Sequence, residues 1–104
     1  MPQAPSPARI RVQDVARRGV YEFGPEEPVM RGPYDLFHPA GAVHRRGPLV
    51  EWREGDQPRT ARVVGSTLGT THPGERVLVR LPPRADDDEW WLCEVQSVDG
   101  VPGT

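Results

Sequence analysis

The sequence has no lysine and no asparagine, and it has a single cysteine among its 104 residues. One cysteine, Cys93, excludes an internal disulfide and a cysteine-based zinc cluster, and it fits a reducing compartment. No hydrophobic run reaches the length of a membrane span. The first residues, 1–7, lack the charged-then-apolar order of a signal peptide, so we expect a cytoplasmic location and no membrane partner.

Because lysine is absent, all 13 basic residues are arginines, a bias that fits a GC-rich coding genome. The formal net charge is only -2, so the chain as a whole has no basic field that would attract nucleic acid. The charge is unevenly spread, however. Residues 1–48 carry seven arginines and five acids, whereas residues 49–104 carry six arginines and ten acids.

Large aliphatic side chains and phenylalanine are also scarce, whereas the chain contains 11 glycines and 13 prolines. This composition lies close to the limit at which burial of apolar groups offsets the lost chain entropy. The length allows one domain. We therefore expect one small domain with long turns or arms.

The N-terminal half predicts little regular structure. Residues 1–9 read as an extended proline-rich arm, and residues 10–40 as a short helix followed by an irregular extended segment. The helix is predicted over residues 10–18, because Val12, Val15 and Ala16 recur at helical spacing before a glycine. Prolines and glycines interrupt residues 20–48 throughout, which is typical of a binding segment or of one ordered by a partner.

The second half predicts a small β domain over residues 41–101, followed by a tail at 102–104. Residues 49–53 and 59–64 read as one β-hairpin, and residues 76–81 and 90–98 as a second. An added strand is expected at 42–44. The predicted fold class is therefore mainly β, a small barrel or strongly bent sheet with a short N-terminal helix and a long Pro/Gly-rich arm.

Side-chain alternation in the second hairpin separates two faces. Trp91, Cys93 and Val95 share a face that we assign to the core, opposite Val77, Val79 and Leu81. The other face carries an apolar patch edged by arginines, formed by Trp90, Leu92, Leu78, Arg76 and Arg80. Two interpretations of this patch stay open. Either residues 20–48 fold over it, or it is a partner-binding surface, since Trp and Arg are enriched at binding hot spots.

Residues 74–98 contain the run Gly74-Glu75-Arg76-Val77-Leu78-Val79-Arg80-Leu81, then an acidic turn, then Trp90-Trp91-Leu92-Cys93-Glu94-Val95. This pattern resembles the central hairpin of SH3-like barrels, including Tudor modules. Similar strand-turn-strand sequences occur in bacteriophage head–tail and tail proteins. The resemblance covers residues 74–98, about a quarter of the chain. It implies an SH3-like barrel, and a virion location if the chain is viral.

The sequence offers no recognisable metal site. The acidic run 86–89 falls at a predicted hairpin tip, where carboxylates are solvated, and it lacks the ligand spacing of a calcium loop. His38 and His44 are six positions apart, and His72 adds no zinc spacing. We therefore expect no bound metal and no cofactor.

Nucleophilic catalysis is not indicated either. Cys93 is expected to point inward, and Ser66 lacks the Gly-x-Ser-x-Gly setting of a nucleophile elbow. The Gly65–Thr71 stretch lacks the Gly-Lys-Ser/Thr ending of a phosphate-binding loop. We therefore assign no catalytic residue and expect a protein that is not an enzyme.

Two arginine doublets, Arg17–Arg18 and Arg45–Arg46, are candidate contacts to phosphates or to an acidic partner. The leading hypothesis is a structural or assembly protein that docks on neighbouring subunits through its arms and β core, as a homo-oligomer or in a larger assembly. A bacteriophage virion component is its most concrete form. The alternative is an SH3- or Tudor-like adaptor that binds nucleic acid or a regulatory protein in a GC-rich bacterium, with nucleic acid not favoured.

Overall fold

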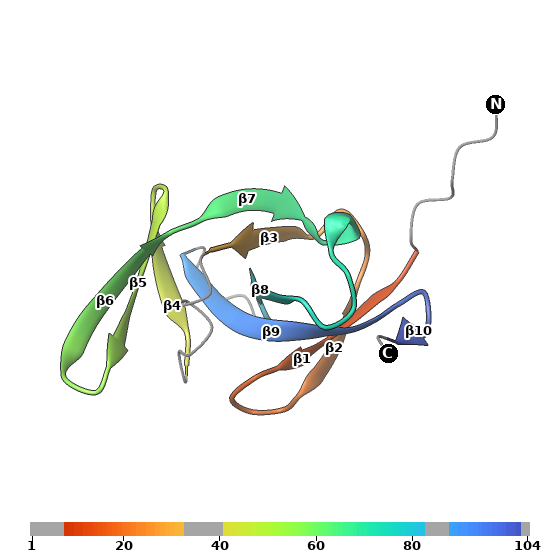
Figure 1. Ribbon diagram of the computed structural model, residues 1–104, viewed down its shortest axis with the longest axis horizontal. Helices are drawn as coiled ribbons and strands as arrows, with labels where there is room; N and C mark the ends of the chain where they lie inside the picture. Colours follow the sequence, from red (N-terminus) through yellow and green to blue (C-terminus); the bar gives the residue numbers. More distant parts are fainter. Residues whose placement is uncertain (1–7, 33–40, 83–87, 103–104) are drawn as a thin grey trace.

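The computed structural model describes residues 8–32, 41–82 and 88–102, which fold into an all-β, nearly closed small barrel (Figure 1). The expectation of a mainly β fold is confirmed, and the architecture is compatible with an SH3-like barrel. The strands are β1 (Ile10–Asp14), β2 (Val20–Phe23), β3 (Pro28–Arg31), β4 (Val43–Arg46), β5 (Leu49–Glu54), β6 (Gln57–Arg62), β7 (Val64–Thr67), β8 (Arg76–Val79), β9 (Glu89–Val98) and β10 (Val101–Pro102), with a 3-10 turn η2 at Leu68–Thr70.

The strands pair in the order β6-β5-β4-β9-β8-β3-β7, and all of these pairs are antiparallel. In addition, β1 pairs with β2 and β9, and β10 pairs with β9. The longest strand, β9, therefore has four partners. It pairs with β8 and, over successive parts of its length, with β4, β1 and β10.

The expected helix over residues 10–18 is wrong, because residues 10–14 form strand β1. Alternate residues Ile10, Val12 and Asp14 are buried, which is the period of a strand and not of a helix. The strand bonds to two neighbours, with Val12 opposite Tyr21 on one side and opposite Val95 on the other. The helical spacing of Val12, Val15 and Ala16 was misleading, because Val15 and Ala16 belong to the turn that follows β1.

Both predicted hairpins are confirmed. In the first, β5 and β6 pair from Leu49 opposite Arg62 to Glu54 opposite Gln57. Its turn contains Gly55 at a φ of 64°, a left-handed conformation that favours glycine. In the second, β8 pairs with β9, and the expected added strand is present as β4.

The apolar side chains form two buried clusters, one on each face of the β8–β9 hairpin. The first fills the barrel and consists of Ile10, Val12, Val29, Leu68, Val77, Val79, Leu81, Cys93 and Val95. Five of its members, Val77, Val79, Leu81, Cys93 and Val95, confirm the face assigned to the core, and the sixth assigned residue, Trp91, packs against the cluster. The second lies between this hairpin and the β4–β5 strands and consists of Met30, Val43, Val50, Val63, Leu78, Trp90 and Leu92.

The second cluster shows that the apolar patch formed by Leu78, Leu92 and Trp90 is buried, and not a free partner-binding surface. Leu78, Leu92 and Trp90 are 0%, 2% and 4% exposed. They are buried because β4 pairs with the start of β9, which brings Val43 and then Val50 of β5 over this face. The alternative, that residues 20–48 fold over the patch, agrees with the contributions of Met30 and Val43.

The two arginines expected to edge that patch are half-buried. Arg76 lies opposite Glu94 across the β8–β9 pair, and its Nε is 3.5 Å from the Glu94 carboxylate. Arg80 follows the end of β8. Both arginines belong to the margin of a packed interior, not to a free apolar surface.

Most of the proposed arm, residues 1–7, lies outside the described residues, as do His38, the Asp86–Asp87 pair and residues 103–104 of the tail. The described end of the arm is fixed by hydrogen bonds. The amides of Ala8 and Arg9 both donate to Asp99 Oδ1, over 2.7 and 3.0 Å. Within 8–32, 41–82 and 88–102, no helix is long and apolar enough to cross a membrane.

Candidate interaction surface

The β5–β6 hairpin projects from the barrel at the end of the molecule opposite β10 (Figure 1). Most residues of both strands are exposed, although Val50 is buried and Glu51, Trp52 and Ala61 are half-buried. Among the described residues, β6 pairs only with β5, so its other edge leaves backbone N–H and C=O groups unpaired by any strand.

Strand register defines the outer face of the β4–β5–β6 sheet. Val50 and Ala61 are directly opposite each other and pack against the second cluster, so the residues next to them along the strands point the other way. The outward side chains form three cross-strand rows: Arg46, Leu49 and Arg62; then His44, Glu51 and Thr60; then Arg53 and Pro58.

Arginines dominate the charge of this outer face. Arg46 forms an ion pair with Glu51 at 3.2 Å, and the Arg46 side chain is 78% exposed. Within the described part of the chain, Arg53 donates only to the backbone carbonyl of Asp56, over 3.4 Å, and Arg62 forms no ion pair. Three arginines and one glutamate therefore give the face a formal charge of +2.

An open hollow of about 730 Å³ lies over the same strands. It is lined by Gly41, Ala42, His44, Arg46, Glu51, Trp52, Arg53, Pro58, Arg59, Thr60 and Asp88. Trp52 is half-buried and packs against the second cluster, so its ring supports the hairpin from the core side. The hollow is open, so it suits an extended partner better than an enclosed small molecule.

The two arginine doublets have different environments. Arg45 and Arg46 are on β4, where Arg45 donates from Nε to the Gly47 carbonyl over 3.0 Å. Arg17 instead forms a short-range ion pair with buried Asp14, and Arg18 occupies the turn between β1 and β2 at a φ of 60°. Arg17 and Arg18 therefore belong to a structural turn, whereas Arg45 and Arg46 belong to the exposed sheet.

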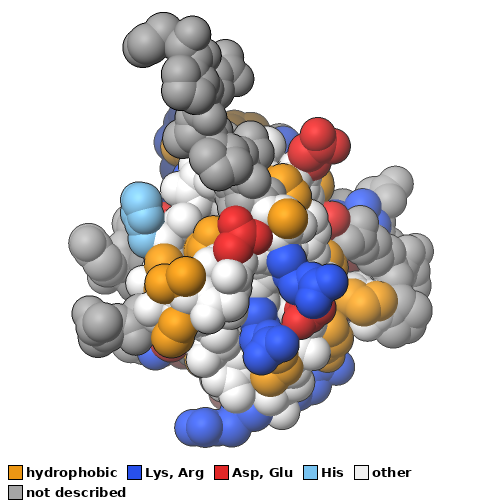
Figure 2. Space-filling model, turned by 90° about the vertical axis from the view of Figure 1, so that its right-hand side faces the viewer, with side chains coloured by type: hydrophobic (Ala, Val, Ile, Leu, Met, Phe, Trp, Pro, Cys, Tyr) orange, Lys and Arg blue, Asp and Glu red, His pale blue; other side chains and the backbone are white. Residues whose placement is uncertain are grey.

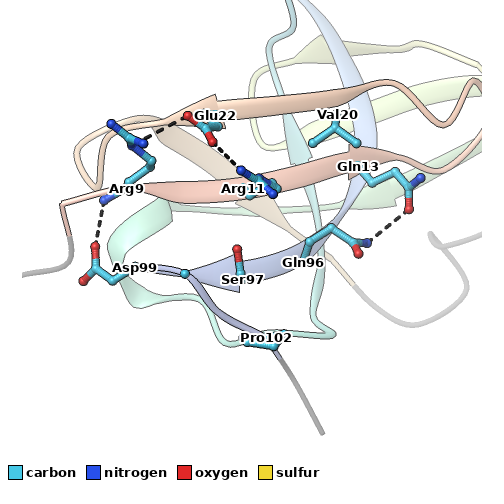
Figure 3. A pocket seen from close by; sticks show the side chains of 10 residues that line it. Arg9, Arg11, Gln13, Val20, Glu22, Gln96, Ser97, Asp99 and Pro102 are labelled. Atoms are coloured by element: carbon cyan, nitrogen blue, oxygen red, sulfur yellow. Dashed lines mark hydrogen bonds and ion pairs between the residues drawn. The ribbon is translucent and has the colours of Figure 1, made fainter.

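A second hollow, also of about 730 Å³, lies over β1, β9 and β10 (Figure 3). Its charged side chains pair with one another: the Glu22 carboxylate contacts Arg11 Nη2 at 2.8 Å and Arg9 Nε at 3.6 Å. The hydrogen bond from Arg11 lowers the pKa of Glu22. Gln96 Nε2 donates to Gln13 Oε1 across the hollow. At this end, Figure 2 shows acidic and basic side chains interspersed, not a field of one sign.

Arg45 and Arg46 stand out in the sequence as a doublet, whereas Arg53 and Arg62, which share the outer face with Arg46, were not predicted. The register of the correctly predicted β5–β6 hairpin could have identified both residues. Once Glu54 and Gln57 flank the turn, counting back along both strands places Arg62 opposite Leu49. Arg53 then falls on the same side as Leu49 because the side-chain period is two.

The side chains considered for metal binding or catalysis do not gather into one site among the described residues. No group of three or more His, Cys, Asp or Glu side chains within the described ranges could hold a metal ion. The Ser66 hydroxyl is 2.8 Å from Thr70 Oγ1 and accepts a hydrogen bond from Arg31. Cys93 is buried, and this burial raises the pKa of its thiol to about 12.

No protein-family model, curated protein or solved structure matches the chain. Its function is therefore inferred from its own geometry. The strongest surface feature among the described residues is the projecting β5–β6 hairpin with an unpaired edge and an arginine-rich face.

Proposed function

We propose that the chain is a non-enzymatic assembly protein that docks on neighbouring copies of itself through the β5–β6 hairpin. The observation that carries this proposal is the exposed hairpin, which extends beyond the barrel and presents the edge of β6. Unpaired strand edges are templates for pairing with another chain. The resemblance to bacteriophage head–tail and tail proteins makes a virion component the most concrete form of the proposal.

The way the hairpin is anchored supports this role. Val50, Trp52 and Ala61 attach its base to the second cluster, whereas the residues around Gly55 are exposed. A rigid base fixes the direction in which the tip points, so little conformational entropy is lost when the hairpin binds.

The test is the mass of the untagged chain, measured by size-exclusion chromatography with light scattering over a range of protein concentrations. The matched variant replaces Arg53–Pro58 with Asn-Gly, because Trp52 and Arg59 are directly opposite and a two-residue turn can join them. This change shortens the hairpin and keeps Trp52 on the core.

We expect a discrete oligomer for the natural chain and a monomer for the shortened variant, with the circular dichroism spectrum unchanged. A monomer at every concentration of the natural chain would overturn the proposal. So would an oligomer that survives the shortening, since the hairpin would then not be the contact.

A further inference from the structure

We propose that the outer face of the β4–β5–β6 sheet binds the phosphate backbone of duplex DNA. This inference is independent of self-assembly, because it uses the arginines of the sheet face and not the edge of β6. It gives the nucleic-acid alternative a specific location.

The first argument is the arrangement of the cations. Arg46 and Arg62 flank Leu49 in one row across three strands, so their backbones are about 10 Å apart at the usual spacing between strands. Arg53 is four residues beyond Leu49 on β5, about 13 Å along the strand. A duplex carries one negative charge per about 1.7 Å of its axis, so a surface of this size meets several phosphates at once.

The second argument is the availability of the guanidinium groups. The structure leaves Arg62 and Arg53 without a carboxylate partner among the described residues, and the pair between Arg46 and Glu51 is exposed. Exposed pairs of this kind contribute little, so Arg46 can exchange its carboxylate for a phosphate at low cost. A guanidinium binds phosphate oxygens through two parallel hydrogen bonds.

The third argument is the distribution of charge over the whole chain. Residues 43–62 contain five arginines and three acids, which is a net charge of +2. Because the whole chain has a net charge of -2, all other residues together carry a net charge of -4. The resulting field favours the approach of a polyanion to the segment 43–62. A duplex is favoured over a single strand because its axial charge density is higher.

The experiment measures binding of a fluorescent duplex of about 20 base pairs by anisotropy, between about 50 and 200 mM salt. With three phosphate contacts, log K should fall with log salt at a slope of about -2.7, which is a loss of about 40-fold in affinity over that range. Replacing Arg53 and Arg62 with Gln should reduce the slope to about -0.9.

The matched control replaces Arg9 and Arg11 with Gln, because these exposed arginines line the opposite hollow and the change in net charge is the same. It should bind as the natural chain does. Binding that is absent at low salt, or that falls equally in the control and in the Arg53/Arg62 variant, would overturn the proposal.

Two further probes separate the related ligands. Equal or tighter binding of a single strand of the same length, or of poly-glutamate, would overturn the assignment to duplex DNA. Weaker binding of both would support it. Circular dichroism and the unfolding midpoint of each variant establish that the barrel is intact, since all four substituted arginines are exposed.

Discussion

The guanidinium carbon of Arg17 lies 4.1 Å from the centroid of the Trp91 ring, while Arg17 Nε donates to Asp14 Oδ2 over 2.9 Å. Asp14 is 1% exposed, and its Oδ1 accepts from the amides of Ala16 and Arg17 over 2.9 and 3.2 Å. The hydrogen bond with Asp14 raises the pKa of Arg17. One buried carboxylate thus organises the turn between β1 and β2 and places a cation over an aromatic ring.

Replacing Asp14 with Ala should lower the free energy of unfolding by about 2–3 kcal/mol, because it removes the buried carboxylate that accepts hydrogen bonds from the amides of Ala16 and Arg17 and from the Arg17 guanidinium. Urea denaturation measures the loss. The control is Glu22→Ala, which removes an exposed carboxylate paired with two arginines and should cost much less than Asp14→Ala. Equal losses in the two variants would contradict the role of Asp14.

The second cluster should behave as a core and not as a binding surface. Leu78→Ala and Trp90→Ala should each lower the free energy of unfolding by about 3–5 kcal/mol through lost burial and a residual cavity. Leu49→Ala, at a side chain that is 39% exposed, should cost less than about 1 kcal/mol. Thermal and urea unfolding measure all three. A loss at Trp90 no larger than at Leu49 would refute the packing described above.

The pKa of Cys93, raised by burial to about 12 from 9.0, predicts a loss of stability in alkaline solution. The thiol of the unfolded chain ionises above pH 9 whereas the folded thiol does not, so the stabilisation is complete below that pH and is lost as pH rises toward 12. Between pH 9 and about 10.5 the loss should be about 1–2 kcal/mol.

The matched variant for this prediction is Cys93→Ala, which removes the titrating group. Urea denaturation of both proteins should show a shallower alkaline decline for the variant. In parallel, a thiol reagent should modify the folded chain only as fast as the chain opens. Rapid modification at neutral pH, or identical pH profiles, would refute the prediction.

Arg18 has a φ of 60°, a left-handed conformation that is unfavourable for residues other than glycine. Arg18→Gly should therefore raise the free energy of unfolding by about 0.5–1 kcal/mol, after allowance for the greater freedom of glycine in the unfolded chain. At Gly55, with a φ of 64°, substitution by Ala should have the opposite sign and cost about 1 kcal/mol. Changes of the same sign at both positions in chemical denaturation would contradict this.

Local patterns predicted the second half of the chain well. Alternating side chains and turn residues identified both hairpins and the strand β4, because adjacent strands joined by short turns carry their pairing information in sequence. The prediction failed at residues 10–18. There β1 pairs with its neighbour β2 and also with the distant β9, with Ile10 opposite Val98, and no local pattern shows a pairing over that second distance.

The candidate surface was predicted only in part for the same reason. Arg45 and Arg46 stand out as a doublet, whereas Arg62 becomes part of the surface only through its position opposite Leu49. Whether the patch around Trp90 is covered stayed open, because alternation assigns a side chain to a face but does not say what covers that face. Val43 and Val50 cover it through the pairing of β4 with β9.

The position of β9 in the chain has a consequence for synthesis. Strand β1 pairs with residues up to Val98, so it leaves the ribosome well before its partner does. At the usual rate of elongation the delay is roughly 5–20 s. During that time Ile10 and Val12 cannot pack against Cys93 and Val95 of β9. The nascent chain therefore cannot complete the pairing of β1 with β9 until β9 has emerged.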